Sequence, residues 1–177
     1  MQAWRDYFIF ARSIGATLLG LLFVATSLNA ETILSGSYRH LKELAGQTYQ
    51  NFILVVVVSL FFLFPGLSAA WNFVLFGILG IYGIGWVTFR LSVVVRSPMR
   101  EHHWTRVIRR MLPAAIACAL LIYAGFGASR ADTAAVLAAL GSASILLLIS
   151  GAATSWDLLV RVAEYRQRHV SDLAPGR

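Results

Sequence analysis

Six polar residues stand at the borders of long apolar runs, where their side chains would lie at a common depth in a bundle of helices. They are Asn29, Glu31, Gln47, Gln50, Asn51 and Asp157. Gln47 and Asn51 are four residues apart and share one face of a helix, and Gln50 is three residues from Gln47. Amide and carboxylate oxygens gathered in this way could line a polar vestibule for a cation. The same residues could equally form ordinary hydrogen bonds between helices.

Arg12 lies about one turn inside an apolar segment that begins near Tyr7. A charged residue at such a position is costly in lipid and is a candidate functional residue. It predicts either a gate or an ion pair inside a helix bundle, or a side chain that extends to the outer headgroups.

His102 and His103 are adjacent, which invites a metal or catalytic interpretation. Neighbouring side chains on a helix point about 100° apart, so the two rings would chelate one ion poorly. No cysteine, spaced histidine or carboxylate cluster completes a site. The HExxH, GxSxG and phosphate-loop motifs are also absent from the sequence. We therefore expect no catalytic site, no metal and no cofactor, and we expect the pair to be solvated beside Glu101.

The composition favours a lipid environment for the elements that carry these residues. Hydrophobic residues make up 58% of the 177-residue chain, charged residues 13%, and the mean hydropathy is +0.70. A soluble domain has roughly 25% charged residues. Uncharged runs cover residues 13–30, 44–89, 111–129 and 133–156. About 20 apolar residues cross a hydrocarbon layer roughly 30 Å thick, so each run is long enough.

The second run is long enough for two crossings, and Pro65 and Gly66 near its middle favour a turn. The predicted fold is therefore all-α, an integral membrane bundle of five transmembrane helices with a short cytoplasmic amphipathic segment. The spans are expected at about 7–29, 47–64, 69–90, 108–128 and 133–158. They form a single domain over residues 1–170, and residues 171–177 are predicted to be a disordered tail.

The first thirty residues also resemble a secretory signal, with Arg5 and Arg12 ahead of an apolar stretch at 14–24. Cleavage after Ala30 would place Leu28 where a small residue is required. We therefore interpret this segment as a retained span.

The basic residues are divided unevenly between the two sides of such a bundle. Twelve of the 15 fall in the first loop, the third loop and the C-terminal segment: Arg39, Lys42, Arg90, Arg96, Arg100, Arg106, Arg109, Arg110, Arg161, Arg166, Arg168 and Arg177. Only Arg5, Arg12 and Arg130 fall on the other side. Cytoplasmic loops carry the excess of Lys and Arg. The split predicts an inner-membrane protein with its N-terminus outside and its C-terminus in the cytoplasm.

The third loop carries the predicted amphipathic segment. Ser97 and Pro98 suit a helix start, as N-cap and first helical residue. The residues expected to contact lipid or a partner are Arg96, Arg100, Trp104, Arg106, Arg109 and Arg110. Arginines that flank spans meet anionic headgroups, so the sequence pI of about 10.3 does not indicate nucleic-acid binding.

Small residues recur at helical spacings in three of the predicted spans. They are Gly77, Gly80 and Gly83; Ala135, Ala139 and Ala143; and Ala16 and Gly20. Small residues let helices approach closely in lipid, within one chain or between chains. The single cysteine, Cys118, fits a small core residue.

These patterns favour a non-enzymatic multi-pass protein, first of all a homo-oligomeric channel or transport component whose polar vestibule faces the cytoplasm. The alternative is an accessory or regulatory subunit of a larger membrane complex that binds a partner or anionic lipid. The two differ in one structural respect. A transport role predicts a wet polar path that reaches Asn29, Glu31 and Asn51, whereas an accessory role predicts that these groups are paired and dry.

Overall fold

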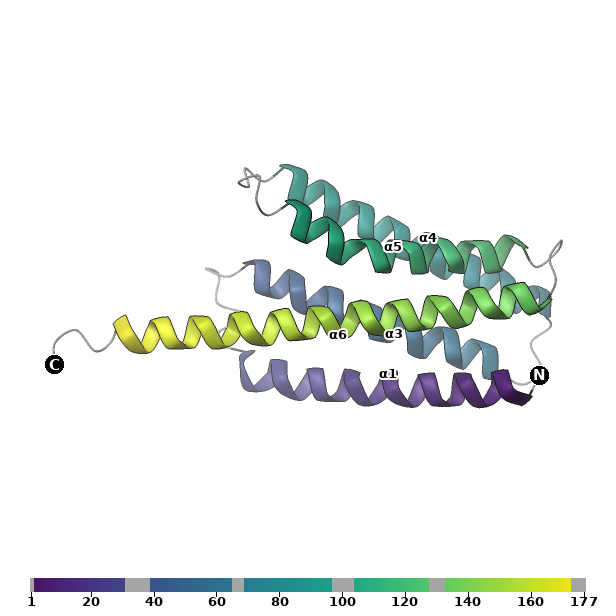
Figure 1. Cartoon of the computed structure of the whole chain (residues 1–177), viewed down its shortest axis with the longest axis horizontal. Helices are drawn as coiled ribbons and strands as arrows, with labels where there is room; N and C mark the ends of the chain where they lie inside the picture. The colour runs from purple at the N-terminus through teal and green to yellow at the C-terminus, as the bar shows by residue number, and fades with distance from the viewer. Residues whose placement is uncertain (1, 31–38, 65–68, 97–103, 128–132, 173–177) are drawn as a thin grey trace.

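The computed structural model of the chain describes residues 2–30, 39–64, 69–96, 104–127 and 133–172 (Figure 1). In these ranges it has five helices and no strand, which confirms the predicted all-α class. The helices are α1 (Gln2–Leu28), α3 (Arg39–Leu63), α4 (Ala69–Arg96), α5 (Trp104–Gly127) and α6 (Thr133–Asp172).

Successive helices run in opposite directions along one axis (Figure 1). Their order in space differs from their order in the chain. The last helix, α6, packs between α3 and α5, while α1 packs on α3 and α4 packs on α5. Consequently α3 and α4, which are consecutive, barely touch each other.

That same end collects most of the basic residues, because α1, α4 and α6 finish there and α3 and α5 begin there (Figure 1). We call it the basic end. The basic residues in the parts of the described helices nearest this end are Arg39, Lys42, Arg90, Arg96, Arg106, Arg109, Arg110, Arg161, Arg166 and Arg168. Arg5 and Arg12 lie near the start of α1, at the opposite end. The alternating directions thus reproduce the charge division seen in the sequence.

Four helices are long and apolar enough to cross a membrane: Gln2–Leu28, Leu41–Leu63, Val74–Ser92 and Thr133–Glu164. In α5 the apolar stretch is shorter, from Met111 to Phe126. At 1.5 Å per residue the whole of α5 is about 36 Å long. Its basic first turns would have to extend their side chains to the headgroups if it crosses, so the fifth span stays a prediction.

Two helix boundaries differ from the sequence expectation. Arg90 was expected in the third loop, but α4 continues to Arg96. The predicted amphipathic segment is helical from Trp104, where α5 begins, and α5 continues from there into its apolar part without a break. The expected start at Ser97 lies outside the described residues. The tail was expected from Ser171, but α6 reaches Asp172.

The surface of the bundle is apolar and part of its interior is polar. Phe10, Leu28 and Trp156 expose 67%, 81% and 72% of their area. Large contiguous apolar surfaces are rare on soluble monomers. The buried side chains include polar ones, namely Gln47, Thr48, Asn51, Ser59, Ser144, Ser150 and Thr154. This distribution fits a bundle whose outer faces meet lipid.

The glycines of α4 let that helix approach α5, as their spacing predicted. A Cβ on Gly80 would lie 2.8 Å from the backbone nitrogen of Ile122 and 2.9 Å from the carbonyl oxygen of Cys118. Backbone atoms at these distances cannot move aside cheaply. In α6, Ala139 and Ala143 are buried and Ala135 is exposed. Ala16 and Gly20 face away from the other described helices.

Candidate functional site: a polar seam and a notch on either side of α3

Four buried polar side chains join α3 to α6, and we call them the polar seam: Thr48, Asn51, Ser150 and Thr154. The Asn51 amide donates to Ser150 Oγ at 3.0 Å. The Thr48 hydroxyl donates to Thr154 Oγ1 at 2.9 Å, and the Thr154 hydroxyl donates to the Ser150 carbonyl at 2.8 Å. All four residues are at most 3% exposed. Helical spacing on both helices brings two polar layers into register.

The predicted polar residues separate into different environments. Asn51 belongs to the seam, and Gln47 is buried beside it. Gln50 is half-buried. Asn29 donates to the Ala25 carbonyl of its own helix at 2.9 Å. Glu31 lies outside the described residues.

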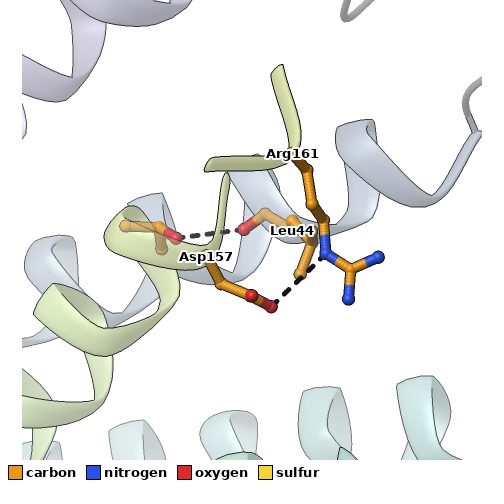
Figure 2. Close-up of polar contacts among 4 residues, drawn as sticks. Leu44, Asp157 and Arg161 are labelled. Carbon is orange, nitrogen blue, oxygen red and sulfur yellow. Dashed lines mark hydrogen bonds and ion pairs between the residues drawn. The ribbon is translucent and has the colours of Figure 1, made fainter. Parts of the chain in front are cut away.

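Asp157, the sixth member, forms an ion pair with Arg161 one turn later on α6 (Figure 2). The Nε–Oδ2 distance is 3.5 Å, and the two side chains stay about one third exposed. Leu44 of α3, also labelled in Figure 2, accepts a hydrogen bond at its carbonyl oxygen from the Thr48 hydroxyl at 3.1 Å. An exposed pair at this spacing contributes about 0.3–0.5 kcal/mol. Its role is local, at the point where α6 leaves the bundle.

On the other side of α3 lies a small cavity that we call the notch. From α3 it is lined by Gln47, Gln50, Asn51 and Leu54, from α4 by Gly83, Trp86, Val87 and Arg90, and from α5 by Met111, Ala114 and Cys118. Its volume is about 10 Å³, close to the space that one water molecule needs. The notch therefore gathers three of the six predicted residues, without Asn29 or Asp157 in its lining. It does not have the width of an ion path.

Arg90 of α4 connects two of the three helices that border the notch, α4 and α3. Its Nη1 donates to the carbonyl oxygen of Glu43 on α3. Its guanidinium also lies over the Trp86 ring, 5.1 Å from the centroid. A Cβ on Gly46 would be 2.8 Å from Arg90 Nη2, so the missing side chain at Gly46 makes room for the guanidinium. The sequence pattern placed Arg90 in a loop. The four-residue spacing of Trp86 and Arg90 is the signal that could have indicated this contact.

The Trp86 indole is a second unusual group at the notch. Its Nε1 is buried and makes no hydrogen bond with any described residue. Leaving a buried donor unpaired costs about 1–3 kcal/mol. Such a group in a native protein indicates an acceptor that comes from solvent or from a ligand.

The remaining predicted residues are placed here only by the helix that carries each one. Arg12 is half-buried on α1 and makes no ion pair or hydrogen bond with the residues described. Arg96 ends α4, Trp104 begins α5, and Arg106, Arg109 and Arg110 lie in its first two turns. Arg100, His102 and His103 lie outside the described residues. Within the described ranges no group of three or more His, Cys, Asp or Glu side chains could hold a metal.

Comparison of the chain with protein-family models, with curated proteins and with solved structures gives no match. The fold and the two sites define the protein as a helical bundle with apolar outer faces. Its function is therefore inferred from the polar seam and the notch, which both include residues of α3.

Proposed function

We propose that the chain is a non-enzymatic, multi-pass membrane protein that acts as an accessory or regulatory subunit of a larger membrane assembly. The observation that carries this proposal is the pairing of the polar seam. Asn51, which a transport path was expected to reach, is 3% exposed and bonded to Ser150. Buried polar groups that bond to a neighbouring helix hold helices together, whereas a conduction path needs its polar groups open to water. Asn51 also borders the notch, but that cavity has space for only about one water molecule.

The length of α6 supports the same role. Its 40 residues correspond to about 60 Å, twice the roughly 30 Å of a hydrocarbon layer. The C-terminal part of α6 extends beyond the ends of the other helices (Figure 1). From Asp157 onward it carries charged residues, including the exposed Glu164. In the proposed orientation this extension projects into the cytoplasm from the inner membrane, where it reaches a partner protein.

A homo-oligomeric channel is the second candidate, and the outer face of α1 favours it. Ser13, Thr17 and Gly20 are exposed on one side of that helix. The two hydroxyls bond to carbonyls one turn earlier in their own helix, with Ser13 donating to Ile9 and Thr17 to Ser13. Small hydroxyl residues on an outer face could pack against, or line a pore with, the same face of other copies.

Reconstitution into liposomes separates the two candidates. The accessory role predicts no flux of protons, potassium, sodium or chloride above that of empty liposomes. It also predicts that a photo-crosslinking amino acid at Glu164, on the extension, captures a distinct partner in native membranes. The same amino acid at the exposed Thr133, at the opposite end of α6, is the matched control. Ion flux that requires the protein, together with no capture specific to position 164, would contradict the accessory role.

Orientation is tested separately. The proposed topology predicts that a C-terminal fluorescent-protein fusion is bright and a C-terminal alkaline phosphatase fusion is inactive, because that enzyme requires export. An active phosphatase fusion would reverse the orientation.

A further inference from the structure

We propose that the notch binds one water molecule, which joins the Trp86 indole of α4 to the Gln47 amide of α3. The water accepts the Trp86 Nε1–H and donates to the amide oxygen of Gln47. This inference is independent of the accessory role, since either candidate function is compatible with a water held between two helices.

The two groups that the water joins are the first observation. Trp86 Nε1 is buried and has no acceptor among the described residues. Gln47 is 7% exposed, and its side-chain amide forms no hydrogen bond with another described residue. Both residues line the notch. A buried donor and a buried amide on different helices thus border one cavity without a bond between them, and buried polar groups in native proteins are bonded to protein or to ordered water.

The size of the notch is the second observation. Its volume of about 10 Å³ is close to the least space that holds one water molecule, and it is too small for an organic ligand. Cavities lined only by apolar groups stay dry, whereas a buried water usually has about three hydrogen-bond partners. Besides Trp86 and Gln47, the notch is lined by Asn51. The amide nitrogen of Asn51 donates to Ser150, and its amide oxygen can accept from the water.

The groups around the notch favour water over an ion. Arg90 lines the notch and lies over the Trp86 ring, so a cation would meet a positive charge and the hydrogen of the indole. The Glu43 side chain interacts electrostatically with Arg90 and partly offsets its charge, which weakens the attraction for a bare anion. Water both accepts and donates, and it therefore matches an N–H donor on α4 and an amide oxygen on α3.

The helical register of α3 and α4 is the third observation. Arg90 bonds to the carbonyl of Glu43. Trp86 precedes Arg90 by four residues, and Gln47 follows Glu43 by four residues on a helix that runs in the opposite direction. The Trp86–Gln47 pair therefore lies about one turn farther from the basic end than the Arg90–Glu43 bond. A bridging water is nearly as favourable in enthalpy as a direct hydrogen bond, and it gives α3 and α4, which barely touch, a second connection.

NMR spectroscopy of the full-length protein in detergent tests the water directly. With ¹⁵N-labelled tryptophan, the five tryptophans give five indole N–H signals, and Trp86→Phe identifies the Trp86 signal by its loss. We expect this signal to show a nuclear Overhauser effect to water with the sign of a long-lived contact. Trp156, whose side chain is exposed, is the control and should show no long-lived contact. A Trp86 signal without this effect would overturn the proposal, because a dry notch or a bound ion gives none.

A double-mutant cycle in thermal unfolding tests whether the two groups share the water. Trp86→Phe keeps an aromatic ring and removes the N–H, and Gln47→Leu removes the amide at similar size. If both groups bind one water, each substitution should lower the unfolding temperature less in the presence of the other than it does alone. Additive shifts would contradict a shared water.

If Trp86→Phe fails to fold, a structure of the wild-type protein at a resolution that shows ordered waters decides. We expect a density peak within about 3.2 Å of both Trp86 Nε1 and the Gln47 amide oxygen. An empty notch, or a direct bond between the two side chains, would overturn the site.

Discussion

The two sides of α3 place similar polar side chains in different environments. Thr48 and Asn51 face α6, where each finds a hydroxyl partner and is almost completely buried. Gln47 and Gln50 line the notch, which Asn51 also borders, and one arginine bonds α4 to α3 there. Among the described residues, the notch also holds a buried donor without a partner, Trp86 Nε1. We therefore assign tight packing to the seam side of α3 and looser packing to the notch side.

Enlarging Gly151, on the seam side, should have the largest effect. A Cβ there would lie 2.5 Å from Phe52 Cε1 and 2.9 Å from Cζ, and Phe52 is buried at 1% exposure. Gly151→Val is expected to destabilise the protein by about 2–3 kcal/mol, as overpacking does. Thermal unfolding in detergent, followed by size-exclusion chromatography, measures the change.

Gly20→Val is the matched control, because nothing lies within 4 Å of a Cβ at Gly20. It should leave the unfolding temperature close to that of the wild type. If the two variants unfold at the same temperature, the seam side is not tightly packed.

Replacing Asn51 tests the hydrogen bonds of the seam. Asn51→Leu removes the donor to Ser150 Oγ and should cost about 1 kcal/mol, the usual scale for a polar contact between membrane helices. A double-mutant cycle with Ser150→Ala isolates the pair, with an expected coupling of about 0.6 kcal/mol. Gln50→Leu, on the notch side, should cost no stability. A larger loss for Gln50→Leu than for Asn51→Leu would reverse the assignment of the two sides.

The expected fold could be deduced because lipid imposes simple rules. The uncharged runs, and the residue types Pro65 and Gly66 within the longest run, predict the number and position of the helices, since a span must be helical and about 20 residues long. The glycine spacing in α4 likewise predicts a close approach, which occurs against α5. These are local properties of the chain, and they need no knowledge of which helices are neighbours.

The site could be predicted only in part because it depends on which helices are neighbours. Asn51 and Gln47 were found from their spacing, but Thr48, Ser150 and Thr154 were not, since a hydroxyl in an apolar run gives no signal of its own. Their partners are about 100 residues away, and only the insertion of α6 between α3 and α5 brings them together. Arg90 was missed for the same reason, because its partners Glu43 and Gly46 lie on a helix that precedes it.

Loss of Arg90 should open the notch without unfolding the bundle. Because Arg90→Gln removes the bond to Glu43, α4 has little left to hold it to α3. Alkylation of Cys118, now buried, is expected to become about fivefold faster in detergent without added lipid, which corresponds to roughly 1 kcal/mol of opening free energy. Lys42→Gln is the control and should leave the rate unchanged. An unaltered rate in Arg90→Gln would mean that other contacts keep the notch closed.

Gly46→Ala, on the notch side, should have the smallest effect on stability, and its contrast with Gly151 sharpens the comparison. A Cβ at Gly46 would meet only the far end of the Arg90 side chain, which can rotate away. Alanine also favours a helix over glycine by about 1 kcal/mol, which offsets the lost contact, so the unfolding temperature should stay near that of the wild type. The same kind of substitution would then disturb packing on one side of α3 and be tolerated on the other. A Gly46→Ala protein with a clearly lowered unfolding temperature would show that the notch side is packed as tightly as the seam side.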